Sequence, residues 1–325
     1  MKITKNLSGL SKNEIRSTYF SNMKPILNDR AMFADATEEY RSPEEPSAGD
    51  TVKLKFRTAK YNVDRVEVVV NGIAYSMKKF MTNTNFDYYI AEFTLGAQRT
   101  EYYFHALVGR TSIYYNQAGP YRELNPTYNF VINPGFKTPD WAKGAVIYQI
   151  YVDRFHNGDK SNDVVDNEYV YIGEPVHRIT DWNEYPATMD VRNFYGGDLQ
   201  GGLDKMDYLE SLGIDAIYFN PLFVSPSNHK YDIQDYDYID PHFGVIVNDG
   251  GEPLPDNARS NDNATKYKKR VTDYANLEAS NEFFAKLVEE AHRRNIKVII
   301  DGVFNHCGSF NKWMDKEKFY TKNKN

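Results

Sequence analysis

The chain has 325 residues, of which 41% are hydrophobic and 26% are charged, and its formal net charge is -6. This length and composition are typical of a globular protein with a sizeable core, and two domains are expected. The negative charge, without any block of basic residues, argues against nucleic acid or an anionic membrane surface as a partner. No apolar run is long enough to cross a bilayer, which argues against a membrane protein.

The amino-terminal residues and the cysteine count bear on the compartment. Cys307 is the only cysteine, which excludes a disulfide within the chain and is compatible with a reducing environment. Residues 1–17 contain lysines but lack the apolar stretch of a secretory signal. We therefore expect a cytoplasmic protein in which residues 1–30 form a leader segment ahead of the first domain.

Residues 31–133 predict an antiparallel β-sandwich. Short runs that alternate between apolar and polar residues are separated by turn residues, and Asn71-Gly72 is a typical hairpin turn. The runs are TVKLKFRTA, DRVEVVVNG, YYIAEFTL, TEYYFHALVG and YNFVIN. The segment that follows, residues 134–144, contains two prolines and a glycine within its first six residues and is predicted to link two domains.

From residue 145 the pattern changes to strands that alternate with helices. Continuous apolar runs predict strands buried on both faces, and the second intervening helix has its apolar residues on one face. This order predicts a parallel α/β fold, in which functional residues follow the carboxyl ends of the strands. The predicted strands are 145–152, 214–219 and 296–300, and the predicted helices are 202–212 and 283–291.

The α/β segment is expected to be incomplete. A (β/α)8 barrel needs eight strands and about 250 residues, whereas only three strands are predicted here. A three-stranded parallel sheet would leave apolar edges unpaired. We therefore expect that the source sequence continues beyond Asn325.

An acidic loop follows the first α/β strand. It contains Asn157, Asp159, Asn162 and Asp163, whose oxygen atoms could converge on a hard cation such as calcium. The alternative is an ordinary Asn-Gly turn in a solvated acidic loop. The spacing differs from that of an EF-hand, so it does not decide between the two.

Several common catalytic motifs are missing from the sequence. The stretch YGGDLQGG at residues 195–202 lacks the Gly-Lys-Ser/Thr of a P-loop and the preceding strand of a dinucleotide fingerprint. There is no Gly-x-Ser-x-Gly, Cys-x-x-Cys or His-Glu-x-x-His pattern. Serine hydrolase and zinc chemistry therefore lose their strongest sequence support.

Two polar stretches follow the second and third predicted strands. Residues 225–244 mix tyrosine and histidine with four carboxylates, a composition that suits a polyol because tyrosine rings cover sugar faces while polar groups bind hydroxyls. The alternative is a tyrosine-rich loop that packs on the rim of the fold. The stretch DGVFNHCGSF places Asp301 and His306 at the tip of the third strand, where a lone histidine is more often structural.

Taken together, these stretches resemble the α-amylase superfamily, glycoside hydrolase family 13, and most closely its neopullulanase, cyclomaltodextrinase and maltogenic amylase branch. The resemblance implies that residues 31–133 are a starch-binding-type β-sandwich. It also implies that residues 145–325 supply the first three strands of a (β/α)8 barrel, incomplete in this chain. The matching motifs are YQIYVDRF at 148–155, FYGGDLQGG at 194–202, HKYDIQDY at 229–236, IDPHFG at 239–244 and DGVFNH at 301–306.

The resemblance also implies roles for individual residues. Tyr231 would stack on the sugar at the scissile bond, and His306 would bind that sugar's hydroxyls. Asp301 would hold an arginine of the cleft, and Asn305 would brace the cleft or, in some relatives, bind calcium. His229 and Asp232 belong to the same substrate-binding segment as Tyr231.

A family calcium site is implied as well. It would use Asn157, Asp159, Asn162 and Asp163, completed by the Gly196 carbonyl and Asp198. The long segment 245–279 departs from the short connection of the family. The preferred substrate, whether starch, pullulan or cyclodextrin, is therefore left open.

The chemistry that the resemblance implies is retaining glycoside hydrolysis, which uses two carboxyl groups about 5 to 5.5 Å apart. In the family these groups come from the fourth and fifth barrel strands, so the catalytic residues are expected beyond Asn325. The expected function is that of the N-terminal portion of an α-glucan hydrolase, inactive alone, with homodimerisation through the N-terminal domain by analogy. A non-catalytic α-glucan-binding or interaction protein with a vestigial barrel is the alternative, and a transglycosylase is a third interpretation.

Overall fold

The structure is a computed structural model that describes residues 8–21 and 27–321. The chain divides into two compact units, Met1–Pro139 and Asp140–Asn325, and each is described by itself. The division falls within the predicted linker, residues 134–144. Part of the predicted leader forms α1 (Lys12–Ser21), and residues 1–7 and 22–26 lie outside the described residues.

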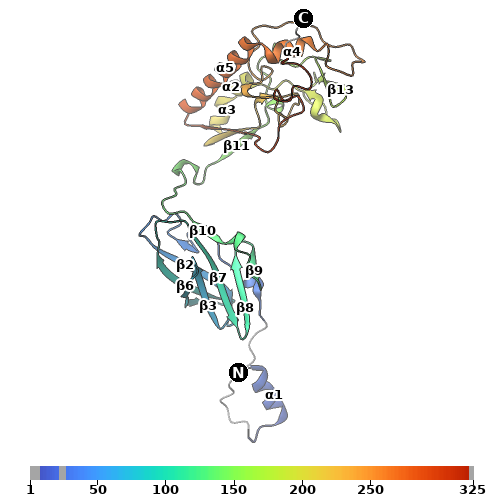
Figure 1. Cartoon of the computed structure of the whole chain (residues 1–325). Coiled ribbons are helices and arrows are strands. Elements are labelled where there is room, and N and C mark those ends of the chain that lie inside the picture. Colours follow the sequence, from blue (N-terminus) through green and yellow to red (C-terminus); the bar gives the residue numbers. More distant parts are fainter. Residues whose placement is uncertain (1–7, 22–26, 322–325) are drawn as a thin grey trace. The chain divides into compact units, whose positions relative to one another are not determined.

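The first unit contains a β-sandwich, as predicted, made of two antiparallel sheets (Figure 1). The smaller sheet has the order β1-β2-β6-β5, and the larger has the order β4-β3-β7-β8-β9, with β10 also paired to β7. The strands of the smaller sheet are β1 (Arg41–Ser42), β2 (Thr51–Ala59), β5 (Lys78–Thr82) and β6 (Phe86–Thr94). Those of the larger are β3 (Arg65–Val70), β4 (Ile73–Ser76), β7 (Thr100–Val108), β8 (Thr111–Asn116), β9 (Gly119–Tyr121) and β10 (Phe130–Ile132).

Alternating burial builds the core of the sandwich. On β2, the side chains of Val52, Leu54 and Phe56 are completely buried while those between them are at least partly exposed. Asn71 and Gly72 connect β3 to β4 with φ values of 46° and 82°. Two successive positive φ values define a type I′ turn, which confirms the predicted hairpin.

The second unit is built on a parallel sheet with the order β11-β16-β19 (Figure 1). Its strands are β11 (Ile147–Ile150), β16 (Ala216–Phe219) and β19 (Lys297–Ile300), all within the predicted ranges. Side chains of the covering helices, including Leu199, Leu209 and Leu287, join Ile217 and Phe219 in one core. The helices are α2 (Leu199–Asp204), α3 (Met206–Ser211), α4 (Thr265–Thr272) and α5 (Tyr274–Arg293).

Two helical predictions need correction. The single helix predicted over residues 202–212 is two helices, because Lys205 between them has φ and ψ of -99° and 7°. The segment 245–279, predicted as an extended loop, contains α4 and the beginning of α5. Amphipathic spacing in α5 begins well before the residues from which that helix was predicted.

The prediction that the first strand is buried on both faces is wrong for this chain. Val146 and Ile147 are more than half exposed, and Ile300 of β19 is 40% exposed. Only the central strand has a neighbour on each side, so its side chains are more completely covered. Within the described residues, the three parallel strands form an open sheet and not a closed barrel.

The loops after these strands contain short elements. Pairs of short strands form two-stranded sheets, two antiparallel and one parallel. They are β12 (Val170–Tyr171) with β13 (Glu174–Pro175), β14 (His177–Arg178) with β15 (Asn193–Phe194), and β17 (Phe223–Val224) with β18 (Asp235–Ile239). The 3-10 turns are Asp29–Ala31, Pro126–Tyr128, Asp140–Ala142, Val152–Arg154 and Asp190–Arg192.

Candidate functional site

Polar side chains meet at the carboxyl ends of β16 and β19. The Tyr218 hydroxyl, on β16, donates a hydrogen bond of 2.7 Å to Oδ2 of Asp301, which directly follows β19. This hydrogen bond raises the pKa of Tyr218 to about 12. Burial and the Asp301 carboxylate together raise the pKa of Tyr231. The structure thus brings together Asp301 and Tyr231, two of the predicted site residues.

A compact turn holds His229 and Asp232, the other two predicted site residues of the 229–232 segment. Nδ1 of His229 accepts a hydrogen bond of 3.0 Å from the Tyr231 backbone amide, so its ring proton is on Nε2. Burial lowers the pKa of His229 more than the Asp232 carboxylate raises it. Oδ1 of Asp232 accepts hydrogen bonds from the hydroxyls of Ser225, at 2.6 Å, and Ser227. His229 is therefore a neutral donor, and Oδ1 of Asp232 holds the turn.

Within the part of the chain that the structure describes, the side chains of His306 and Asn305 make no hydrogen bond to this turn. Both side chains are exposed, and Nδ1 of His306 is 3.3 Å from Oδ1 of Asn305. The His306 carbonyl accepts a hydrogen bond of 2.7 Å from the Tyr236 hydroxyl. Among the hydrogen bonds of the described residues, none joins the His306 side chain to Tyr231 or Asp301.

The predicted cation ligands converge from two loops. Nδ2 of Asn157 donates to Oδ1 of Asp163 at 2.7 Å, and Nδ2 of Asn162 donates to Oδ2 of Asp198 at 3.3 Å. Gly196 has a φ of 81°, and a Cβ at that position would lie 2.4 Å from both the Asn157 amide and the Asp163 carboxylate. Glycine is therefore required where the second loop meets the first.

Among the described residues, two buried amide oxygen atoms where these loops meet lack a hydrogen-bond partner. Oδ1 of Asn157 and Oδ1 of Asn162 are buried, and within the described part of the chain neither has a hydrogen-bond partner. Leaving a buried acceptor unpaired costs about 1–3 kcal/mol. A hard cation would satisfy both, so these amide oxygens fit calcium. The Asp163 carboxylate is ion-paired with Arg178 and would have to share its charge between that partner and the ion.

Asp159 and Asp198 fit a cation less directly. Oδ1 of Asp159 accepts hydrogen bonds from the backbone amide and hydroxyl of Ser161. Asp198 caps the N-terminus of α2 by accepting from the Gly201 amide at 2.6 Å, and it also accepts from the Gly158 and Asp159 amides. Among the described residues, no group of three or more His, Cys, Asp or Glu side chains is arranged to hold a metal. Any cation here would rely on amide and carbonyl oxygens together with the single carboxylate of Asp163.

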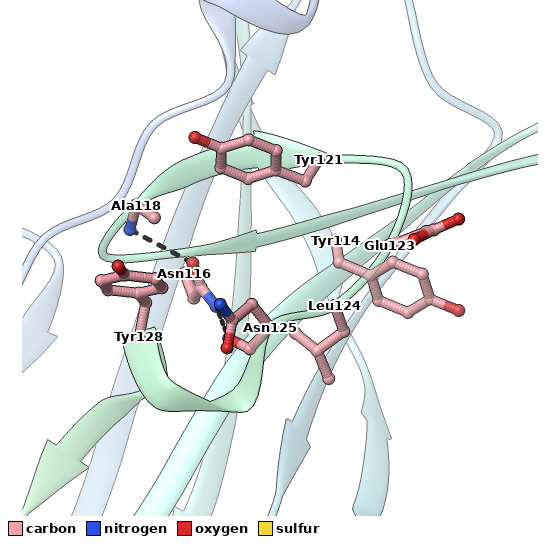
Figure 2. A pocket seen from close by; sticks show the side chains of 8 residues that line it. All are labelled: Tyr114, Asn116, Ala118, Tyr121, Glu123, Leu124, Asn125 and Tyr128. Atoms are coloured by element: carbon pink, nitrogen blue, oxygen red, sulfur yellow. Dashed lines mark hydrogen bonds between the residues drawn. The ribbon is translucent and has the colours of Figure 1, made fainter.

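The sandwich contains a separate cavity of about 580 Å³ that the sequence did not predict (Figure 2). Figure 2 shows its tyrosine rings arranged around the Asn116 and Asn125 side chains. The Asn116 amide is fixed, since it donates to the Asn125 carbonyl at 2.9 Å and accepts from the Ala118 amide at 3.2 Å. The cavity is lined mainly by Tyr114, Tyr121, Tyr128, Glu123, Asn116 and Asn125.

Family profiles match both units of this chain. Residues 149–262 and 259–325 match the alpha amylase catalytic domain, and residues 45–133 match the alpha amylase N-terminal ig-like domain. The chain belongs to the α-amylase family, glycoside hydrolase family 13, and contains an immunoglobulin-like domain followed by part of the catalytic domain. Within that family it belongs to the neopullulanase, cyclomaltodextrinase and maltogenic amylase branch.

Curated relatives show the extent of the similarity. A cyclomaltodextrinase of Thermoanaerobacter pseudethanolicus is 37% identical over 81% of this chain and 40% of that protein. Neopullulanase 2 of Thermoactinomyces vulgaris is 34% identical over 86% of this chain and 41% of that protein. An intracellular maltogenic amylase of Bacillus subtilis is 32% identical over 83% and 41%, respectively. The chain thus spans about two fifths of the length of these relatives.

A solved cyclomaltodextrinase structure is similar as well. It is 29% identical, with a TM-score of 0.45, over 87% of this chain and 42% of that chain. In the described part of the present chain, no helix combines the length and the apolar content that a bilayer crossing requires.

Proposed function

We propose that this chain is the N-terminal portion of a retaining hydrolase that cleaves α-glucosidic bonds in starch-derived oligosaccharides. In this proposal β11, β16 and β19 are the first three strands of a (β/α)8 barrel, and residues 145–325 supply one wall of its cleft. The catalytic carboxylates are outside these 325 residues. The relatives named for cyclomaltodextrin, pullulan and maltogenic activity support an α-glucan substrate.

The observation that carries the proposal is the cluster of Tyr218, Tyr231 and Asp301 at the carboxyl ends of parallel strands. In a barrel, these ends surround the active site. The exposed apolar residues Ile147 and Ile300 lie on the two outer strands, where further strands would cover them. Tyr231 would offer its ring to the sugar, His229 and His306 would donate to hydroxyls, and Asp301 would hold an arginine from the remaining barrel.

The expected result is that the 325-residue chain releases no reducing sugar from β-cyclodextrin or maltoheptaose, whereas the chain with its encoded continuation does. In the longer chain, Tyr231→Ala should lower kcat/KM about 10- to 100-fold, because a stacked aromatic ring contributes about 1.5–3 kcal/mol. Tyr208→Ala, which removes a half-exposed tyrosine from α3, is the matched control and should change little. Turnover by the 325 residues alone, or a coding sequence that stops at Asn325, would contradict the proposal.

A second candidate is an α-glucan-binding protein that acts through its sandwich. The cavity bordered by Tyr121 and Tyr128 favours it, because exposed tyrosine rings and nearby amides suit a sugar. In this case Tyr121→Ala with Tyr128→Ala would abolish maltoheptaose binding by the 325-residue chain, and Tyr231→Ala would leave it unchanged. Isothermal titration calorimetry distinguishes the two. A homodimer formed through this sandwich, and an intracellular location like that named for one relative, also remain predictions.

We also propose calcium as the ligand of the 157–163 loop, held by Asn157, Asn162, Asp163 and the Gly196 carbonyl, with Asp159 and Asp198 adjusting to it. Calcium would tie the two loops together and contribute nothing to bond cleavage. At about 100 times its Kd, calcium should stabilise the chain by about 2.7 kcal/mol. Asn157→Ala should abolish this calcium-dependent rise in Tm, while Asn183→Ala, in the exposed 181–189 segment, should retain it. Equal calcium responses in all three proteins, measured by calorimetry with and without EGTA, would contradict the assignment.

A further inference from the structure

Lys230 lies between His229 and Tyr231, and it is unusual in two respects. Its side chain is only 1% exposed, although an ammonium group is costly to bury unless it is paired. Its backbone φ is 61°, in the left-handed region that residues with a Cβ rarely adopt. Such a conformation persists only where the surrounding structure enforces it.

The Lys230 ammonium is held from inside the β17–β18 hairpin. Its Nζ donates to Oδ2 of Asp240 at 2.6 Å and to the Ser225 carbonyl at 2.8 Å. It also lies 4.8 Å from the centre of the Phe243 ring and 5.7 Å from that of Phe194, both within cation–π range. The two hydrogen bonds are directional and the two rings border the remaining space. Together they hold the ammonium in one defined position.

Asp240 is fixed in turn by a chain of buried charges. Its Oδ1 is 2.8 Å from Nδ1 of His242, whose Nε2 is 2.8 Å from Oε1 of Glu168. Oε2 of Glu168 accepts a hydrogen bond of 2.9 Å from Nη1 of Arg270, on α4. Three separate segments of the chain therefore set where the Lys230 ammonium must lie.

Local hydrogen bonds transmit this position to the neighbours of Lys230. Its backbone amide donates to the Ser227 hydroxyl at 3.1 Å, and the next amide, that of Tyr231, donates to Nδ1 of His229 at 3.0 Å. The lysine side chain points into the unit while the His229 and Tyr231 side chains remain half-buried. The turn is therefore anchored at its middle residue.

We propose that Lys230 is a positioning residue whose buried ion pair with Asp240 holds His229 and Tyr231 in the orientation that receives an α-glucan. This inference rests on the proposed function for the identity of the ligand. With Lys230 in place, His229 keeps its proton on Nε2, directed away from the turn. Without the ammonium, the backbone can leave the left-handed conformation and the His229–Tyr231 hydrogen bond is lost.

A positioning role differs from a purely stabilising one in what it predicts. Replacing both members of a buried ion pair by uncharged groups of similar volume is often neutral or even stabilising. A stabilising role therefore predicts that an uncharged pair which folds will also retain the geometry of the turn. A positioning role predicts a folded protein in which the orientation of His229 is no longer fixed.

The test uses the 325-residue chain with Lys230→Met combined with Asp240→Asn. Long-range ¹H–¹⁵N NMR of His229 should show a single Nε2–H tautomer in the wild type and a mixture of tautomers in the double variant. Maltotriose affinity should fall at least about 10-fold. The control is Lys312→Met, which removes the lysine paired with Asp235 on the same hairpin and should leave both readouts unchanged.

A folded double variant that keeps the single Nε2–H tautomer overturns the proposal, whatever its affinity for maltotriose. If the wild type binds no maltotriose but the tautomer changes as expected, the positioning role stands, and the proposed function is decided separately by turnover of the chain with its encoded continuation. Lys230→Gly combined with Asp240→Asn serves if the first double variant does not fold, because glycine tolerates the positive φ while both charges of the pair are removed. This variant should also show a mixture of His229 tautomers, and a single Nε2–H tautomer in it would likewise overturn the proposal.

Discussion

Gly201→Ala is expected to lower the free energy of unfolding of the α/β unit by about 3 kcal/mol, near the upper end for an overpacked site. A Cβ at residue 201 would lie 1.9 Å from the His156 carbonyl oxygen. The 156–158 loop and α2 approach equally closely at Gly158, where a Cβ would lie 2.4 Å from the Gly201 nitrogen. Since both obstacles are backbone atoms, no change of rotamer can relieve them, and the 156–158 loop would have to move away from α2.

The adjacent glycine is the matched control. Gly202 is also in α2, but a Cβ there would be 3.4 Å from Cδ1 of Leu287, close to ordinary contact. Alanine is favoured over glycine in a helix by about 1 kcal/mol, so Gly202→Ala should be neutral or slightly stabilising. Urea unfolding followed by circular dichroism measures both. Similar losses for the two substitutions would show that the close approach at Gly201 is not the cause.

These glycines show what the sequence could not specify. The stretch YGGDLQGG was recognisable as unlike a phosphate loop, but its composition does not reveal which glycine is needed. The requirement at Gly201 comes from the His156 carbonyl, which is 45 residues away in the chain. A contact between distant segments leaves no pattern in either one, so only the structure identifies it.

Elements with one buried face were predicted most accurately. The run TVKLKFRTA predicted β2 with its observed bounds, because its alternate residues enter the sandwich core. The sequence did not predict β5, whose residues are all exposed and therefore lack the alternating pattern. For the parallel sheet, apolar runs located all three strands but not their burial, which depends on neighbours on both sides.

The candidate site was predictable to a similar extent. Tyr231 and Asp301 were each predicted as site residues that follow a parallel strand, and Asp301 raises the pKa of Tyr231. The buried charges were missed, since Glu168, His242 and Arg270 are spread over about a hundred residues with no motif between them. The weak signal available was a histidine flanked by apolar residues in IDPHFG, which is also compatible with an ordinary core.

Arg270→Met should destabilise the α/β unit by about 3–5 kcal/mol, the usual cost of removing one partner from a buried ion pair. The Arg270 side chain is 3% exposed and contacts Glu168, Asp249 and the Asp163 carbonyl at 2.9 Å each. The neighbouring Lys269 pairs with Asp273 but is 42% exposed, so Lys269→Met should cost about 0.5 kcal/mol. Equal losses of unfolding free energy for Arg270→Met and Lys269→Met in chemical denaturation would mean that burial of the Arg270 ion pairs does not increase their contribution to stability.

The pH dependence of stability should distinguish this loss from simple loss of packing. Burial alone would raise the pKa of Glu168, but His242 and Arg270 hold it below its ordinary value. For His242 the signs are reversed: burial alone would lower its pKa, but Glu168 and Asp240 raise it. Glu168 therefore contributes stability above its unfolded pKa of about 4.3, and this contribution is lost as pH falls. His242 contributes below its unfolded pKa of about 6.5, and this contribution is lost as pH rises through its folded pKa.

The cluster of Glu168, Asp240, His242 and Arg270 should consequently stabilise the wild type most between about pH 4.5 and 6.5. In Arg270→Met, Glu168 loses a cation and its folded pKa rises toward the unfolded value, so the Glu168-linked loss of stability in acid becomes smaller. The alkaline loss should persist, because Glu168 and Asp240 still flank His242 on both ring nitrogens. Unfolding free energies measured from pH 3 to 9 test this asymmetry. A variant curve that is merely lower, with the same shape in acid, would assign the effect to packing instead of charge.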